Sequence, residues 1–167
     1  TNAAFPPFES AEGDTYFGVD MEIMAGLAEY LGKEFVVDDM KFESVCTSVS
    51  NGVCDIAASG LTVNETRKET LDFTESYYNA SQYIIVPSND TTFDACKTAD
   101  DVMAILTKLD KNTKIGSQNG TTGKLFIEGD EDWGFDGFPF TTVGIFLNAR
   151  WSGIAFAASR SRNARSK

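Results

Sequence analysis

The sequence predicts an α/β fold built on a largely parallel sheet. Along its first half, short apolar runs alternate with longer stretches whose apolar residues have helical spacing, and this alternation is typical of βα units. Glycines, for example in Asn51-Gly52, stand where helices are expected to end. Ligands of such sheets bind beyond the carboxyl ends of the strands, so a binding site is expected at that edge.

The first elements are expected between residues 5 and 50. Phe5-Pro6-Pro7-Phe8-Glu9 predicts a rigid loop that holds two aromatic rings, because each proline fixes its own φ and favours extended geometry in the residue before it. Asp20 is the expected N-cap of a helix that Gly32 ends. A buried strand at 35–37 and a helix from about Phe42 to Ser50 should follow. The apolar stripe of the first helix should face the core: Ile23, Leu27, Tyr30 and Leu31.

Residues 59–67, Ser-Gly-Leu-Thr-Val-Asn-Glu-Thr-Arg, follow a strand expected at 55–59. Thr62 and Glu65 predict a capping box, and the helix start that it would define attracts anions. Arg67 lies about one turn into that helix, and its guanidinium can hold a carboxylate through two hydrogen bonds worth about 1.5–3 kcal/mol each. Taken alone, these residues fit a capped surface helix better. Their expected convergence with the Phe5–Phe8 loop favours a carboxylate site.

A second lobe is expected after an extended run at residues 82–86. Thr98 and Asp101 predict another helix start. A strand around 114–117 then leads into Gln118-Asn119-Gly120-Thr121-Thr122-Gly123, where N–H groups and hydroxyls could meet an anion, although such glycine turns are usually structural. The helix between them should carry one apolar face: Val102, Ile105, Leu106 and Leu109.

Composition excludes several classes of function. The chain has no histidine, which removes Ser-His-Asp and Cys-His nucleophiles and histidine metal sites. Its net charge of −11 argues against a nucleic-acid partner. Cys46, Cys54 and Cys96 form no CxxC pair; a Cys46–Cys54 bridge stays open, but small buried thiols are favoured. The longest apolar run is far below the roughly 20 residues of a membrane helix. Because the chain has no histidine and no CxxC pair, we expect no metal, and we expect no cofactor either.

The composition changes beyond about residue 140. Residues 150–167 carry no acid, and their basic residues are Arg150, Arg160, Arg162, Arg165 and Lys167. This change predicts that residues 141–167 are a basic tail foreign to the fold, either disordered or a reading-frame scar. A docking arm for an acidic partner is the alternative.

Six blocks of sequence together resemble the extracytoplasmic solute-binding proteins of polar amino-acid ABC transporters. They cover about residues 1–138 in the order and spacing that this family has. The blocks are Phe5-Pro6-Pro7-Phe8-Glu9; Gly18-Val19-Asp20-Met21-Glu22; Asn51-Gly52-Val53-Cys54-Asp55; Ser59-Gly60-Leu61-Thr62 with Arg67; Leu71-Asp72-Phe73-Thr74 with Tyr77-Tyr78; and Ile115-Gly116-Ser117-Gln118-Asn119-Gly120-Thr121-Thr122-Gly123.

The resemblance implies an α/β, two-lobed, periplasmic-binding-protein-like fold, each lobe a sheet flanked by helices. Lobe 1 would span residues 1–86 and a partial lobe 2 residues 87–140, followed by the tail at 141–167. It also implies a fold incomplete at both ends, because family members carry a strand before the position of Thr1 and further elements after Phe140. Open strand edges would follow, so a domain-swapped homo-oligomer is a hypothesis.

The resemblance further implies that the two lobes close on one free amino acid, with a hinge at Tyr83–Val86. Arg67 would bind the α-carboxylate with amides near Thr62 and Thr122, while the Gly60 carbonyl and the Thr62 hydroxyl would receive the α-ammonium. Phe5 and Phe42 would flank the ligand side chain. The full set of expected binding residues is Phe5, Phe42, Ser59, Gly60, Thr62, Arg67, Thr121 and Thr122.

The same resemblance implies a protein outside the cytoplasmic membrane, in the periplasm or lipid-anchored at the cell surface, made with a signal peptide. It would deliver its ligand to the membrane permease of an ABC transporter. Asn2 stands where relatives that select basic ligands often have an acid, so a neutral polar or small amino acid is slightly favoured. Three alternatives stay open: a sensor domain of a membrane receptor, a dehydratase using Glu9 or Glu65, and a folded remnant that binds nothing.

Overall fold

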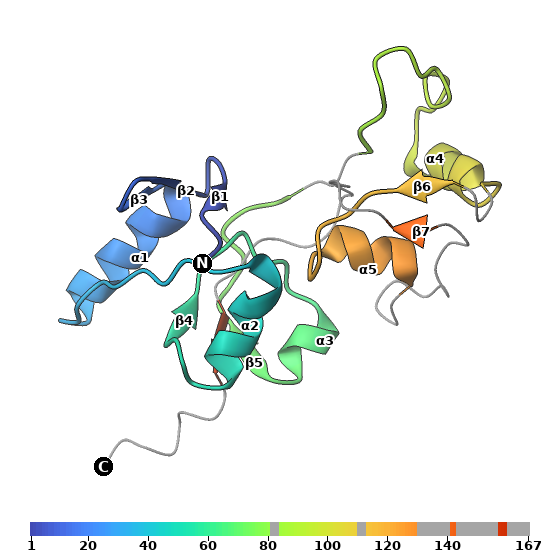
Figure 1. Ribbon diagram of the computed structural model, residues 1–167. Helices are drawn as coiled ribbons and strands as arrows, with labels where there is room; N and C mark the ends of the chain where they lie inside the picture. Colours follow the sequence, from blue (N-terminus) through green and yellow to red (C-terminus); the bar gives the residue numbers. More distant parts are fainter. Residues whose placement is uncertain (81–83, 110–112, 130–140, 143–156, 160–167) are drawn as a thin grey trace. The chain divides into compact units, whose positions relative to one another are not determined.

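The chain forms two compact units in the computed structural model, which describes residues 1–80, 84–109, 113–129, 141–142 and 157–159 (Figure 1). Unit 1 comprises Thr1–Ala80 together with Trp151–Lys167, and unit 2 comprises Ser81–Arg150. The first change of unit therefore falls six residues before the expected end of lobe 1 at residue 86. Part of the hinge expected at Tyr83–Val86 lies outside the described residues.

Unit 1 contains two small sheets and three helices among its described residues. The first sheet is an antiparallel meander in the order β1-β2-β3, and the second has the order β4-β8-β5. The elements are β1 (Ala4–Phe5), β2 (Glu9–Glu12), β3 (Thr15–Phe17), α1 (Val19–Tyr30), α2 (Phe42–Ser50), β4 (Ile56–Ala57), α3 (Glu65–Lys68), β5 (Leu71–Phe73) and β8 (Ala157–Ser159). The meander corrects the prediction that residues 5–8 are only a loop, since Phe5 lies in β1 and the two prolines lie in the turn that follows.

The strand β8 joins β4 and β5 into one sheet. It pairs antiparallel with both neighbours, with Ile56 opposite Ala158 and Leu71 opposite Ser159. The prediction of a largely parallel sheet is therefore wrong for this unit. The prediction of a tail wholly foreign to the fold is also wrong, because residues 157–159 cover strand edges that β4 and β5 would otherwise leave unpaired.

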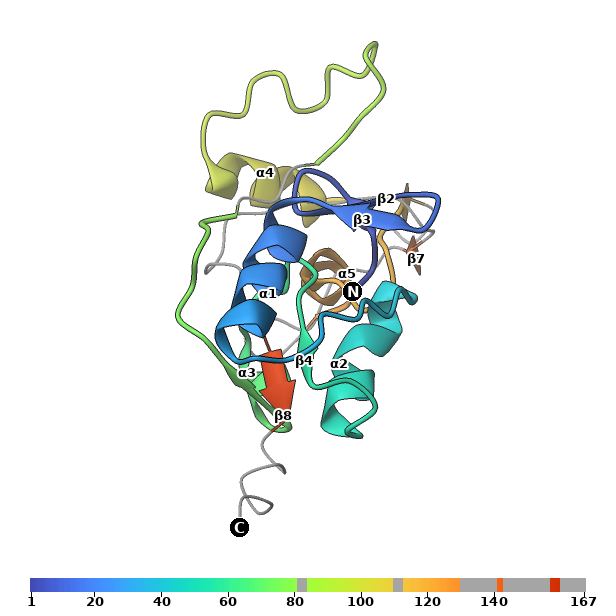
Figure 2. The same cartoon turned by 90° about the vertical axis from the view of Figure 1, so that its left-hand side faces the viewer.

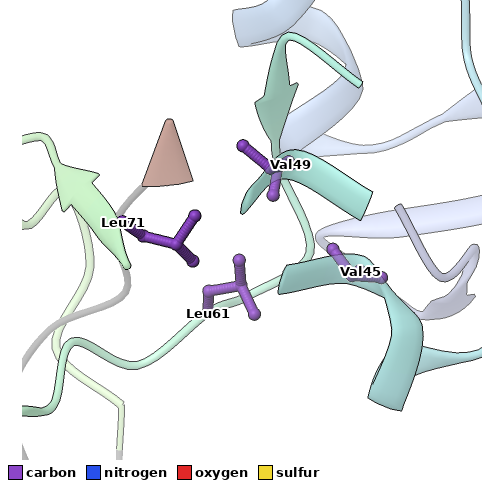
Figure 3. Packing of buried hydrophobic residues seen from close by; sticks show 5 residues of the cluster. Val45, Val49, Leu61 and Leu71 are labelled. Atoms are coloured by element: carbon purple, nitrogen blue, oxygen red, sulfur yellow. The ribbon is translucent and has the colours of Figure 1, made fainter. Parts of the chain in front are cut away.

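The main hydrophobic core lies between α2 and this sheet. Val45 and Val49 of α2 are at most 1% exposed and pack with Ala57, Leu61 and Leu71 (Figure 3). The bounds predicted for this helix are confirmed, because the valines at i and i+4 share one face and the chain leaves the helix through the predicted Asn-Gly stop. Phe42 is thereby placed at the helix start, partly buried against the core.

The helix α1 is anchored differently from the prediction. Its N-cap is Gly18, which makes no side-chain cap, and its first N–H groups donate to the carbonyls of Pro7 and Phe8 at 3.0 and 2.9 Å. Asp20 is therefore not the N-cap, because these backbone carbonyls already satisfy the orphan donors of the helix start. Both views place β4 between α1 and α2 (Figure 1 and Figure 2).

The apolar stripe predicted for α1 faces the core only at Leu27, which packs against Met21 and Met24. Tyr30 is 86% exposed, while the buried residues are Asp20, Met21 and Met24. The strand predicted at 35–37 is also absent: these residues form no ladder, and Val36 is 74% exposed. Periodicity marks an apolar face, but it does not provide the neighbouring strand against which that face could pack.

Unit 2 has a smaller core. Its described elements are α4 (Ala99–Leu106), β6 (Lys114–Ile115), α5 (Thr122–Glu128) and β7 (Thr141–Thr142), and β6 pairs parallel with β7. The helix start predicted at Thr98 and Asp101 is confirmed, and the two residues form a capping box with both reciprocal hydrogen bonds present. Leu106 and Ile127 are the buried centre, and Val102 and Leu109 pack against them as the predicted helix face requires.

Candidate functional site

The turn formed by Ser59 and Gly60 directly follows β4 and is held by two buried carboxyl groups. The Ser59 hydroxyl donates to Glu9 Oε1 at 2.8 Å, and the Gly60 N–H donates to Asp20 Oδ2 at 2.9 Å. Ser59 also accepts from the N–H of Asn2 at 3.0 Å, so the N-terminal segment meets this turn through Asn2 and Glu9 rather than through the predicted Phe5–Phe8 loop. Gly60 has φ +52°, a left-handed conformation that glycine adopts without steric cost.

Both carboxyl groups lie in a strongly desolvated place. Glu9 and Asp20 are 0% exposed. Burial raises the pKa of Glu9 to about 8; the Ser59 hydrogen bond opposes this, and the nearby Asp20 charge adds to it. Burial also raises the pKa of Asp20, opposed by hydrogen bonds from Tyr77 Oη at 2.5 Å and from the Gly60 N–H. Burial and Asp20 together hold the pKa of Tyr77 well above its usual value.

Arg67 lies in the short helix α3. The N-cap of this helix is Asn64, whose Oδ1 accepts from the Arg67 N–H at 2.9 Å. The predicted capping box of Thr62 and Glu65 is therefore wrong, because a side chain nearer to the helix already accepts the N3 donor. Thr62 contributes in another way: its carbonyl accepts a 2.6 Å hydrogen bond from Arg67 Nη1.

The Arg67 guanidinium lies over an aromatic ring. Its Cζ is 5.9 Å from the centroid of Phe42, within the range of a cation–π contact. Burial lowers the pKa of Arg67, and the charge of nearby Cys46 opposes this. Burial likewise raises the pKa of the Cys46 thiol, with Arg67 opposing. A desolvated, oriented guanidinium binds an anion more strongly than one in bulk water, since interactions strengthen as the local dielectric falls.

The structure brings together most of the predicted site residues of unit 1. Ser59, Gly60 and Thr62 form one connected segment with Arg67, and Phe42 reaches that segment from α2 through the ring contact. Phe5 lies apart in β1, where its ring stacks on Phe8 at 5.6 Å between centroids.

Thr121 and Thr122 belong to unit 2. Thr121 is the N-cap of α5: its hydroxyl accepts from the Lys124 N–H at 3.3 Å and donates to the Gln118 carbonyl at 2.7 Å. Thr122 follows at the first position of the helix and is buried. The predicted strand-to-helix turn is therefore present, and the Thr121 hydroxyl forms its hydrogen bonds within that turn.

Sequence reasoning missed the polar network beneath the turn. The sequence offers Glu9 only as a member of a motif block and as a candidate of the dehydratase alternative, Asp20 as a cap, and Tyr77 as part of a motif block. The available signal was an acid placed directly after Phe8 in an aromatic, proline-rich run. That signal does not reveal the partner, because Ser59 is fifty residues away.

A cavity of about 550 Å³ lies elsewhere in unit 1. Its lining is mostly apolar and comes from α1, residues 33–38 and residues 53–58, together with Thr1. Neither Thr62 nor Arg67 lines it. The cavity is therefore distinct from the carboxylate site predicted from the sequence.

The described part of the chain offers no other obvious chemistry. Within it, no group of three or more histidine, cysteine, aspartate or glutamate side chains could hold a metal ion. The three cysteines are partly buried and form no disulfide within this part of the chain, so the open Cys46–Cys54 bridge is absent from it. None of the helices described is both long and apolar enough to cross a membrane.

The fold is that of two-lobed solute-binding proteins. The chain superposes with a TM-score of 0.72 on the amino-acid ABC transporter substrate-binding protein AbpA from Streptococcus pneumoniae Canada MDR_19A bound to L-arginine, at 22% identity, covering 96% of this chain and 80% of that one. It also superposes, with a TM-score of 0.72 and 18% identity, on the ancestral amino-acid-binding protein AncCDT-1, a precursor of cyclohexadienyl dehydratase, covering 96% and 80%.

The family model of bacterial extracellular solute-binding proteins, family 3, matches residues 1–128, and the chain belongs to that family. It is 39% identical over 85 residues to the arginine-binding extracellular protein ArtP of Bacillus subtilis (strain 168), covering 51% of this chain and 33% of the relative. It is 29% identical over 128 residues to the probable histidine-binding protein of Neisseria gonorrhoeae, covering 76% and 44%. The chain thus spans less than half the length of these curated relatives.

Proposed function

We propose that this chain is the amino-acid-binding part of an extracytoplasmic solute-binding protein that serves an ABC importer. The observation that carries the proposal is the Arg67 guanidinium, which is desolvated, oriented by the Thr62 carbonyl and stacked on Phe42. A planar donor fork held in this way suits the two oxygens of an α-carboxylate. The proposal places the protein outside the cytoplasmic membrane, in line with the extracellular family to which it belongs.

The remaining recognition roles follow from the neighbouring groups. Gly60 and Thr62 would receive the α-ammonium through the carbonyl and the hydroxyl, because an ammonium donates three hydrogen bonds and accepts none. Phe42 would contact the ligand side chain beside the guanidinium. The roles of Phe5, Thr121 and Thr122, and delivery to a permease, stay predictions. Closure of the two units would require a ligand that binds the closed state better than the open one.

We propose a basic amino acid, with L-arginine as the first candidate ligand. Several relatives are named as arginine-binding proteins, and one as a probable histidine-binding protein. The earlier preference for a neutral ligand rested on Asn2, whose side-chain amide donates to the Met40 carbonyl at 2.9 Å. Because this amide holds the N-terminal segment in place, it carries little weight in the choice of ligand.

A sensor role on the same fold would use the same site. The dehydratase alternative is weaker, because its two candidate carboxyl groups are poorly placed for chemistry on a bound substrate. Glu9 is fully buried beneath the Ser59 turn, and Glu65 is an exposed partner of Lys68 at 2.6 Å. A general acid or base must reach the proton that it transfers.

The test is thermal unfolding of the chain with L-arginine, L-histidine and L-cystine. A ligand at a hundred times its dissociation constant stabilises by about 2.7 kcal/mol. We expect a rise in the midpoint with arginine, its loss in Arg67→Ala, and a reduced rise in Arg67→Lys, which keeps the charge but not the fork. Lys68→Ala, the neighbouring exposed cation, is the matched control and should bind normally.

Two results would contradict the proposal. The carboxylate assignment fails if Arg67→Ala, shown to be folded by its ligand-free transition, keeps the full arginine shift. Binding by this chain fails altogether if no common amino acid moves the midpoint of the unaltered protein.

A further inference from the structure

We propose that Glu9 and Asp20 are positioning residues that form a one-proton clamp beneath the Ser59–Gly60 turn, so that amino-acid binding above the turn requires the proton on Glu9. This inference rests on the proposed function and adds a control on the same site. The two carboxyl groups come from different elements, Glu9 from β2 and Asp20 from α1. Each holds one of two successive residues of the turn.

The clamp fixes the turn at two adjacent points. One carboxyl group takes the Ser59 hydroxyl and the other takes the Gly60 N–H, at 2.8 and 2.9 Å. The carbonyl of Thr62, which orients Arg67, lies only two residues beyond Gly60. A shift of the turn would therefore move both the expected ammonium acceptors and the partner of the guanidinium.

The geometry favours one proton, held on Glu9. Asp20 accepts two hydrogen bonds, from Gly60 and Tyr77, which stabilise its anionic form. Glu9 accepts from Ser59, and its hydrogen bond with Asp20 raises the pKa of Glu9 while it lowers the pKa of Asp20, as expected when the proton is on Glu9. A second buried anion beside the first is costly, because both desolvation and like-charge repulsion oppose it.

The charged groups around the pair do not remove this cost. Neither carboxyl group forms an ion pair with a lysine or arginine in the parts of the chain that are described. Tyr77, the titratable side chain that donates to Asp20, adds no cation, and its own pKa is held well above the usual value.

Loss of the Glu9 proton should loosen the turn. Two adjacent anions separate, and movement of either carboxyl group breaks its bond to Ser59 or Gly60. The binding-competent fraction then falls with pH, and the apparent dissociation constant rises as the reciprocal of that fraction. With a midpoint near pH 8, affinity should weaken about tenfold between pH 7 and pH 9.

The experiment compares the unaltered chain with Glu9→Gln and with Glu12→Gln, an exposed acid of the same strand. The first readout is the ligand-free thermal midpoint from pH 5 to pH 9. A carboxyl group whose folded pKa is raised makes the folded state bind more protons, so stability falls as pH rises from about 4.5 to about 8. We expect a loss of about 5 °C or more in the unaltered chain and in Glu12→Gln, and a clearly smaller loss, from Asp20 alone, in Glu9→Gln.

The second readout is the dissociation constant of L-arginine by calorimetry at pH 7, 8 and 9. Ionisation of the ligand and of the Thr1 amine is common to all three proteins and cancels in the comparison. We expect the tenfold weakening in the unaltered chain and in Glu12→Gln, and its absence in Glu9→Gln. If Glu9 had a purely structural role, Glu9→Gln would instead change the dissociation constant by the same factor at every pH. Its pH profile would then run parallel to that of the unaltered chain.

The clamp is overturned if the dissociation constants of Glu9→Gln and Glu12→Gln depend on pH in the same way. If arginine binds none of the proteins, the proposed arginine function fails, while the ligand-free midpoints still decide whether Glu9 holds a proton. If Glu9→Gln does not fold, ¹³C-carboxyl titration of the unaltered chain replaces it. A glutamate that titrates well above its ordinary value supports the clamp, and ordinary values for every glutamate overturn it.

Discussion

The helices α1 and α2 lie on either side of β4 (Figure 2), yet they differ in how fully their apolar residues at helical spacing are buried. In α2, Val45 and Val49 are at most 1% exposed. In α1, Ile23 is 39% exposed and Tyr30 is 86% exposed. Both helices have apolar residues at helical spacing, so the difference teaches that periodicity becomes burial only where the fold supplies an opposing surface.

The opposing surfaces of the two helices differ in a simple way. α2 packs on the β4-β8-β5 sheet, where Leu71 of β5 and Leu61 of the segment after β4 complete a closed cluster (Figure 3). α1 instead borders the cavity beside residues 33–38, which form no strand. α1 is held by a polar and an apolar contact: the Asp20 carboxylate accepts from Gly60 and Tyr77, and Met21 and Met24 pack with Ala58.

The largest effect should come from emptying the closed cluster. Leu61→Ala removes a side chain that is 0% exposed, and the resulting cavity should cost about 3 kcal/mol of unfolding free energy. Leu31→Ala, the same chemical change at the end of α1, should stay within about 0.5 kcal/mol because Leu31 is 57% exposed. Urea unfolding measures both. Equal losses would show that the two sides of β4 are packed alike.

A pair of glycines tests how α1 is attached. A Cβ at Gly18 would lie 2.8 Å from the Pro7 carbonyl oxygen, and its φ of +125° strains any other residue, so Gly18→Ala should cost about 2 kcal/mol or more. Gly26 lies in the middle of the same helix with no atom near its missing Cβ. Gly26→Ala should therefore stabilise by about 0.5–1 kcal/mol. Thermal unfolding measures both effects. The prediction is contradicted if the two substitutions shift the midpoint in the same direction.

The smallest effect on stability should come from the exposed face of α1. Changing Tyr30 and Leu31 together to lysine should alter the unfolding free energy by no more than about 0.5 kcal/mol. It should nevertheless reduce the binding of a hydrophobic dye, because exposed apolar patches bind such probes. Ala25→Lys, on the same helix, adds a charge without removing a large apolar group and should leave dye binding unchanged. Unchanged dye binding in the double variant would show that the dye binds to an exposed apolar patch other than the one formed by Tyr30 and Leu31.

The sequence was most informative where structure depends on close neighbours. The bounds of α2 and the helix start at Thr98 and Asp101 were predicted correctly, because each depends on residues within one or two turns. The Thr62–Glu65 capping box failed for a local reason as well. Asn64 competes for the same donors and, being nearer to the helix, becomes the cap.

The candidate site was predicted in part. The segment from Ser59 to Arg67 and its association with Phe42 were expected, and the structure brings these residues together. The carboxyl pair beneath the segment was not expected, because its bonds join residues forty and fifty positions apart. Nothing in the local pattern around Asp20 distinguishes a helix cap from a buried anchor.

By itself the sequence determined which helices form, where the arginine-bearing segment follows a strand, and which histidine-dependent chemistries are excluded. The tertiary structure alone decided the rotation of α1, the insertion of β8 between β4 and β5, and the burial of Glu9 beside Asp20. The physical reason is range. Capping and helical spacing act over a few residues, whereas desolvation and strand pairing depend on segments that only the folded chain brings together.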